Sequence, residues 1–362
     1  MIEVTNDSLV VNTTEGLNKE VGANNTSYTK SLTDNTPVLT CGSLCGGIGS
    51  DAVALKNLNI NHSTKFLVEI DKDVVDTYKL NHKVDNVYSD ITTIDPHSLA
   101  KVDLLCISVP CTSFSISGKR LPILEDTRGS LFYYAFNILT INNPKYFLFE
   151  NVEGLLSHQQ GSTWNTILTI LKGLNYNIQF KVLNAKNYGA AQNRKRLFII
   201  GTRKDIKEEF SFPEPQPVSN TVNNYIVKGA DYSDCIFDSS KCIPFTAKKN
   251  TDIKTIYKLP YLKFAADARV ISSNSIAPCI LSSSAYTKFY DEKNKIFRYL
   301  RNSELAEIQG FKSFKWSAGK TKTKRMIGNA INIHTLESIF TNLIPSKYFA
   351  KSAVSSSLGD AA

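Results

Sequence analysis

The sequence contains no hydrophobic run long enough to span a membrane. None of its apolar segments approaches the roughly 20 residues that a membrane-spanning helix needs. The N-terminus also lacks a basic region followed by an apolar core, which is the pattern of a secretory signal. These absences argue against an integral membrane protein and against a secreted one.

Cysteine is sparse, and its spacing is irregular. The seven cysteines are an odd number, no two form a Cys-x-x-Cys pair, and Cys41 and Cys45 have no histidines at zinc-site spacing. A disulfide framework and a structural metal site are therefore not expected. The pattern indicates a reducing compartment, so we expect a cytoplasmic protein, or a nuclear one if the host is eukaryotic.

Acidic residues are outnumbered, because 42 Lys and Arg face 33 Asp and Glu, which gives a formal net charge of +9. Excess positive charge favours a polyanionic partner, since phosphate contacts supply most non-specific affinity for nucleic acids. A lysine-rich surface that serves solubility alone would give the same balance. The 362 residues, 42% of them hydrophobic, suffice for one large α/β domain and a smaller one.

Apolar runs alternate with amphipathic stretches between residues 38 and 201. This pattern is typical of an α/β fold with a doubly wound, mostly parallel sheet, which binds ligands at the carboxyl ends of its strands. Strands are expected near 38–40, 65–68, 102–107, 146–149, 180–183 and 196–201, and helices near 51–58, 74–80, 131–140 and 163–174.

Changes in composition divide the chain into five predicted segments. They are a flexible N-terminal arm (1–36), an α/β domain (37–213), a small irregular domain (214–275), a return to the first domain (276–350) and a flexible tail (351–362). The proline-rich run 212–217 marks the main boundary. Helical periodicity resumes at 303–309 and at 332–343.

A glycine-rich turn at 42–50 follows the first expected strand and opens a helix. Glycines there let the backbone approach a ligand, and a helix N-terminus favours a carboxylate or phosphate. Glu69 follows the next strand, at the spacing where an acid binds ribose hydroxyls, and Asp90 is a comparable candidate for an adenine amino group. Taken singly, these features are also typical of a tight turn and solvated carboxylates. A nicotinamide dehydrogenase would use the same elements but would have no role for a reactive thiol.

A cysteine and a glutamate stand at the ends of two apolar runs. Cys111 follows Pro110 after the run 102–108, and Glu150 follows the run 146–149, so both should emerge at one edge of the sheet. A thiol and a carboxyl group brought together there can add to an aromatic ring and protonate it, which is the chemistry of cytosine-C5 methyl transfer. Cys111 could instead be a small buried hydrophobe. Its Pro-Cys-x-x-Phe-Ser turn is a poor core sequence, and Cys106 in the preceding strand is the expected structural cysteine.

The ordered motifs of the chain resemble those of the DNA (cytosine-5) methyltransferases over roughly residues 37–345. They stand at 44–50, 69, 90, 110–115, 126–129, 150–152, 192–196, 298–311 and 328–330. One such motif is weak evidence, whereas their order is specific. The resemblance implies an S-adenosylmethionine-dependent methyltransferase fold with a target-recognition domain at 214–275. It also implies S-adenosyl-L-methionine as cofactor and specific sites in double-stranded DNA as substrate.

The resemblance also implies which residues hold the cofactor. They are Leu44, Cys45, Gly46, Gly47, Gly49, Glu69, Ile70, Asp90, Ile91, Pro110, Asn329 and Ala330. Glu69 would lie on the ribose and Asp90 near the adenine, with Ile91 beside it. The chain departs from the family where Cys45 and Ile70 replace usual aromatics and Ser50 replaces a usual glycine. We expect these changes to weaken cofactor packing and to leave its polar anchors in place.

Four catalytic residues follow from the same resemblance. Cys111 would add to C6 of a cytosine flipped out of the duplex, and Glu150 would bond its N3 and exocyclic amine. Arg196 would contact cytosine O2, and Arg194 would lie nearer to the DNA backbone. Residues 116–130 would form a lid over the flipped base. The candidate DNA contacts are Ser115, Lys119, Arg120, Arg128 and Arg269, although Lys119 and Arg120 are equally typical of ordinary surface charge.

Two other interpretations stay open. One branch of the family methylates a transfer RNA, but its Cys-Phe-Thr signature is absent, because Ile236 follows Cys235 and Ile243 follows Cys242. A DNA-binding homologue without catalysis is the second, and the intact Cys111 argues against it. We expect a monomeric, stand-alone modification enzyme without a long N-terminal regulatory region. A cognate restriction endonuclease that acts separately is one partner of such an enzyme, and the sequence leaves its existence open.

Overall fold

The computed structural model describes residues 36–110, 131–246, 252–260, 262, 268–283 and 286–350. Most of the predicted N-terminal arm and the whole predicted tail lie outside this part of the chain. So do the predicted lid and five of the predicted site residues, Cys111, Ser115, Lys119, Arg120 and Arg128.

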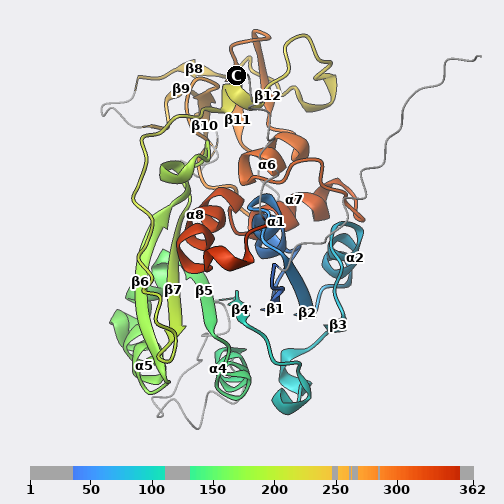
Figure 1. Ribbon diagram of the computed structural model, residues 1–362. Helices are drawn as coiled ribbons and strands as arrows, with labels where there is room; N and C mark the ends of the chain where they lie inside the picture. Colours follow the sequence, from blue (N-terminus) through green and yellow to red (C-terminus); the bar gives the residue numbers. More distant parts are fainter. Residues whose placement is uncertain are drawn as a thin grey trace, which may run out of the picture. The chain divides into compact units, whose positions relative to one another are not determined.

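Seven strands form the first sheet (Figure 1). They are β1 (Leu39–Leu44), β2 (His62–Val68), β3 (Asn86–Tyr88), β4 (Leu104–Ile107), β5 (Tyr146–Val152), β6 (Tyr176–Asn184) and β7 (Lys195–Arg203). Their order is β3-β2-β1-β4-β5-β7-β6. The first five are parallel, and β7 runs antiparallel to both of its neighbours. The predicted α/β fold with a mostly parallel sheet is confirmed.

Helices cover both faces of this sheet because its central strands are apolar on both sides. Alternate residues of β4 and β5 enter two separate hydrophobic clusters, as Leu148 and Phe149 do. The cluster on one face includes residues of α1 (Ser50–Asn57) and α8 (Ile333–Leu343). The cluster on the other includes residues of α4 (Leu131–Asn142) and α5 (Ser162–Lys172).

Five short strands form a second sheet. They are β8 (Ile243–Pro244), β9 (Thr255–Lys258), β10 (Arg269–Ser272), β11 (Lys288–Asp291) and β12 (Ile296–Tyr299), in the order β12-β11-β10-β9-β8. The sheet therefore takes strands from both sides of the predicted boundary at 275. A bridge between Gln192 and Ala277 joins the segment after β10 to the segment before β7.

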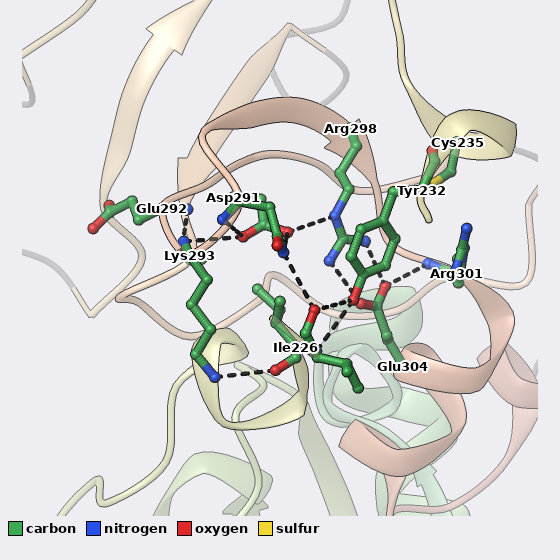
Figure 2. A network of polar contacts seen from close by, with 12 residues as sticks. Ile226, Tyr232, Cys235, Asp291, Glu292, Lys293, Arg298, Arg301 and Glu304 are labelled. Carbon is green, nitrogen blue, oxygen red and sulfur yellow. Dashed lines mark hydrogen bonds and ion pairs between the residues drawn. The ribbon is translucent and has the colours of Figure 1, made fainter. Parts of the chain in front are cut away.

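A buried arginine ties the second sheet to the helices that follow it (Figure 2). Arg298 on β12 is fully buried, and its guanidinium lies 2.8 Å from Asp291 and 2.7 Å from Glu304. Glu304 belongs to α6 (Asn302–Gln309) and also accepts a hydrogen bond from the Arg301 backbone N–H at 2.8 Å. A buried charge costs several kcal/mol unless it is paired and hydrogen-bonded, so these contacts fix β12 against the start of α6.

Two further α-helices lie in the described chain. α2 (Lys72–Asn81) follows β2, and α7 (Lys320–Asn329) follows α6. Thr77 of α2 is within hydrogen-bond distance of Ser317, 2.7 Å away, and of the Met326 sulfur at 3.5 Å. α8 then packs against α1. These contacts bring the end of α7 to the glycine-rich turn after β1.

Replacing Gly201 with Ala should destabilise the fold. Gly201 on β7 faces Phe147 on β5, and an added Cβ would collide with the fully buried Phe147 ring. Overpacking a buried site of this kind costs about 1–3 kcal/mol. Urea unfolding measures the loss, with Gly154→Ala as control because a Cβ there meets no described atom within 4 Å. Equal stability of the two variants would contradict this packing.

Candidate functional site

A cavity of about 640 Å³ opens at the carboxyl ends of β1, β2, β4 and β5. Most of the predicted site residues that the structure describes line it. They are Cys45, Gly46, Gly47, Glu69, Ile70, Pro110, Glu150, Arg194, Arg196, Asn329 and Ala330. The cavity thus combines turns that follow parallel strands with one end of α7, as expected for a doubly wound sheet.

The glycine-rich turn has a left-handed backbone at three positions. Cys45, Gly47 and Gly49 have φ values of 51°, 59° and 85°. Only glycine adopts this region without strain, so Cys45 is held in an unfavourable conformation at the cavity wall. A side chain at Gly49 would also meet Tyr78 and His82, each within 3 Å. Gly49 therefore lets the turn pass beneath α2, and it does not itself line the cavity.

Glu69 fastens this turn to the end of β2. Its carboxylate accepts hydrogen bonds from the backbone N–H groups of Gly47 and Asp71, both at 3.1 Å. Burial raises the pKa of Glu69, and the two backbone hydrogen bonds oppose that shift. The neighbouring Ile70 side chain is 75% exposed and lies on the cavity wall. An acid with lone pairs to spare beside an exposed apolar surface suits a ligand that carries hydroxyls and a flat ring.

Four predicted cofactor residues do not line this cavity in the described structure: Leu44, Gly49, Asp90 and Ile91. Asp90 accepts hydrogen bonds from the Thr92 N–H at 2.9 Å and from the Thr92 hydroxyl at 2.8 Å. These bonds cap the short 3₁₀ turn Ile91–Thr93 and lower the pKa of Asp90. Ile91 is buried in the core. Asp90 therefore stabilises its own turn, and a ligand contact there stays a prediction.

Glu150 and Arg196 form an ion pair inside the cavity. The Arg196 Nε lies 3.2 Å from Glu150 Oε1. The antiparallel register explains the pairing, because Glu150 of β5 opposes Phe198 of β7, and Arg196 lies two residues along β7 on the same face. Burial raises the pKa of Glu150, and the charges of Arg196 and Arg194 oppose the shift. The carboxyl group is therefore easier to protonate than an exposed glutamate, while a cation holds it in place.

Arg194 has a different place from the one that the sequence suggested. Its side chain is 2% exposed. Its guanidinium donates to the backbone carbonyls of Ile280 at 2.9 Å, Gly328 at 3.0 Å and Ala330 at 2.8 Å. The prediction that Arg194 lies nearer to the DNA backbone does not fit this burial. Arg194 instead fixes the end of α7 against the segment after β10, and so helps to shape the cavity wall.

Asn151 has a role that the sequence alone did not assign. Its side-chain amide donates to the Val109 carbonyl at 2.9 Å, and its own Oδ1 accepts from the Val152 N–H. Asn151 therefore joins β5 to the segment that leads into Pro110, which lines the cavity immediately before Cys111 in sequence. The sequence held one signal for this role. Glu150 and Asn151 are adjacent in a strand, so their side chains point to opposite faces, and a cavity residue at 150 places residue 151 on the other face.

A second missed feature is a buried amide network behind Arg194. Gln192 donates to Gln309 at 3.1 Å and accepts from the Ile280 N–H at 2.9 Å. Gln309 in turn donates to the Ile327 carbonyl at 2.9 Å. Every buried amide finds partners here, which rigidifies the junction of β7, α6 and α7.

The remaining predicted DNA contact, Arg269, lies on β10 and lines a smaller, separate cavity. Within the described part of the chain, no group of three or more His, Cys, Asp or Glu side chains could hold a metal ion. The helices described there are also too short or too polar to cross a membrane.

Replacing Glu150 with Gln should change how stability depends on pH. The folded-state pKa of Glu150 is raised, so ionisation weakens the folded state as pH rises from about 4.3 through the raised value. The free energy of unfolding of Glu150→Gln, relative to the unmodified protein, should increase across that window and then stay constant. Urea unfolding at a series of pH values measures this difference. A difference that is independent of pH, or that decreases, would contradict the raised pKa.

Comparisons with known proteins agree with this geometry. The family model of the C-5 cytosine-specific DNA methylases matches residues 39–345. A type II methyltransferase of Lactococcus lactis subsp. cremoris, M1.ScrFI, is 31% identical over 291 residues, which cover 77% of this chain and 71% of that protein. The orphan methyltransferase M.SPRI of Bacillus phage SPR is 40% identical over 173 residues, 47% of this chain and 39% of that protein.

A solved structure shows the same fold. The crystal structure of a Spodoptera frugiperda DNMT2 mutant superposes with a TM-score of 0.67 at 19% sequence identity, and the match covers 85% of this chain and all of that one. At this identity the likeness concerns the fold alone. The family match over most of the chain carries the assignment: the chain belongs to the C-5 cytosine-specific DNA methylase family.

Proposed function

We propose that this protein transfers a methyl group from S-adenosyl-L-methionine to C5 of cytosine at specific sites in duplex DNA. The observation that carries the proposal is the buried Glu150–Arg196 pair, which lies in one cavity with the glycine-rich turn and Glu69. Glu150 and Arg196, an acid and a cation that can bind a pyrimidine, therefore share the cavity with the glycine-rich turn and Glu69, which can bind a nucleoside. Type II methyltransferases among the similar proteins support DNA as the substrate.

The cofactor would occupy the part of the cavity between the glycine-rich turn and Glu69. Glu69 is hydrogen-bonded through both oxygens to backbone N–H groups, so it is oriented to accept further bonds from ribose hydroxyls. Ile70 offers an exposed apolar surface to the adenine in place of an aromatic ring. A volume of about 640 Å³ is within the usual range of ligand pockets. When bound, S-adenosylmethionine would supply the electrophilic methyl group.

The cytosine would occupy the part of the cavity lined by Glu150 and Arg196. Arg196 is a donor for the ring O2, while Glu150, protonated or sharing a proton, would bond N3 and the exocyclic amine. Because thymine carries an N3–H and a carbonyl in place of the amine, this pair selects cytosine. The raised pKa of Glu150 suits an acid that steadies charge on N3 at neutral pH.

Cys111 would be the nucleophile of this reaction. A thiolate that adds to C6 turns the ring into an enamine whose C5 can attack the methyl group, after which loss of the C5 proton and expulsion of the thiolate release the product. Cys111 lies outside the described residues. The position of Pro110 on the cavity wall and the Asn151 bond to Val109 support this role.

The target base must leave the duplex, because neither face of C6 is accessible inside a base stack. Residues 116–130, with Lys119, Arg120 and Arg128, would close over the flipped base, and residues 214–275 would choose the DNA site. We include in the proposal a monomeric enzyme in the cytoplasm, which protects DNA from a separate restriction endonuclease. The names of its type II relatives support that last part.

Replacing Cys111 with Ala should reduce methyl transfer by about four orders of magnitude or more, because the covalent route is lost. DNA affinity should stay within a few-fold, since no DNA contact is removed. The assay measures transfer of tritiated methyl groups to unmethylated plasmid DNA. Cys41→Ala is the matched control, because Cys41 is buried in the core on β1 and lines neither cavity. C5 methylation by the Cys111 variant at a rate close to that of the unmodified protein would show that the nucleophile is another residue.

The same assay with transfer RNA in place of plasmid DNA separates the two substrates. We expect label in DNA alone. Label that enters transfer RNA and not DNA would contradict the proposed substrate and leave the chemistry of the cavity unchanged. Bisulfite sequencing of the methylated plasmid then identifies the recognised site.

A further inference from the structure

A second cavity, of about 190 Å³, lies between the second sheet and α7. Its lining comes from β10, from the segment after it, from the start of β11, and from α6 and α7. The polar members of the lining are Arg269, Cys279, Tyr286, Thr287, Lys288 and Lys324. Three of them are cations, and none of the described lining residues is a carboxylate.

Lys324 is the most unusual of these cations. Its side chain is 2% exposed, and its ammonium group donates to the backbone carbonyls of Leu281, at 2.9 Å, and Ser283. Burial lowers the pKa of Lys324, and no carboxylate among the described residues lies within ion-pair distance to oppose it. Contrast Arg298, which is equally buried but has two carboxylate partners. A buried cation that lacks a counter-ion is costly, and an external anion would relieve that cost.

The two cavities share a wall. Ile280 and Leu281 line both of them, with Glu150 and Arg196 on one side and Arg269 and Lys324 on the other. Leu281 is a largely exposed apolar residue at this wall. Arg194 and Gln192 hold Ile280 by hydrogen bonds, so the wall is fixed relative to the ion pair. An anion in the second cavity would therefore lie at a set distance from the cytosine proposed for the first.

We propose that the second cavity binds one phosphodiester of the target strand, next to the flipped cytosine, through Arg269, Lys288 and Lys324. This inference rests on the proposed function. A nucleotide places its base and its own phosphate a short distance apart, which matches two adjoining cavities with one wall. The phosphate would supply a negative charge that none of the described lining residues carries. It would also hold the backbone while the base is flipped, because phosphate contacts set register and orientation.

The test uses the double variant Arg269→Gln, Lys288→Gln. Binding is measured by fluorescence anisotropy over a series of KCl concentrations, on a duplex that carries the site mapped by bisulfite sequencing. Each phosphate that a protein neutralises contributes about 0.9 to the slope of log affinity against log salt. Lys324 stays bonded to two backbone carbonyls, so Arg269 and Lys288 carry the part of the contact that salt competes with. Because they share one phosphate, the double variant should lose about 0.9 of that slope, and not twice as much. The exposed Lys172→Gln on α5, which lines neither cavity, should lose less than half as much.

Neutral linkages locate the contact on the DNA. A single methylphosphonate is moved through the positions that flank the target cytosine. At one position it should weaken binding of the unmodified protein but have no further effect on the double variant. An unchanged salt slope, or equal sensitivity of both proteins to every neutral linkage, would overturn the phosphate site. A failure of the proposed function can be told apart from a failure of the phosphate site. The proposed function fails if the unmodified protein does not methylate plasmid DNA, and this result does not depend on the variants.

Discussion

The site depends on one buried ion pair, in which Arg196 of β7 holds Glu150 of β5. Ionising a carboxyl group that is only 9% exposed costs free energy. Without a cation nearby, the Glu150 side chain would stay neutral or turn toward solvent. The arginine keeps it ionisable and oriented, and leaves it easier to protonate than an exposed acid. The antiparallel direction of β7 makes this pairing possible, because it places the start of β7, where Arg196 lies, beside the carboxyl end of β5.

Buried polar contacts assemble the rest of the cavity around that pair. Glu69 holds the glycine-rich turn, Asn151 holds the segment that enters Pro110, and Arg194 holds the end of α7. Each of these side chains fixes a backbone segment that is distant in sequence. The cavity is therefore preorganised by hydrogen bonds that lie behind its surface, as a site for precise chemistry requires.

Local pattern was enough to predict six of the seven strands of the first sheet and part of the cavity, while the family resemblance added Arg196, Asn329 and Ala330. Apolar runs marked β1, β2, β4, β5, β6 and β7 near their observed positions, and Glu150 lies at the predicted edge. Three features required the tertiary structure. The left-handed backbone of Cys45 leaves no sequence signature, since cysteine is not among the residues that usually mark a left-handed position. The burial of Arg194 depends on α7, more than a hundred residues further along the chain. The second sheet is built from strands of two to four residues, too short for any periodicity to appear.

Trapping on DNA that carries 5-fluorocytosine at the recognised site tests the central claim most directly, because fluorine at C5 blocks the proton loss that releases the enzyme. The account predicts a covalent complex whose cross-linked peptide contains Cys111, formed rapidly by the unmodified protein and far more slowly by Glu150→Gln. An adduct on another cysteine, or an active enzyme that forms no adduct, would contradict it. Equally fast trapping by the glutamine variant would show that the acid does not assist the addition.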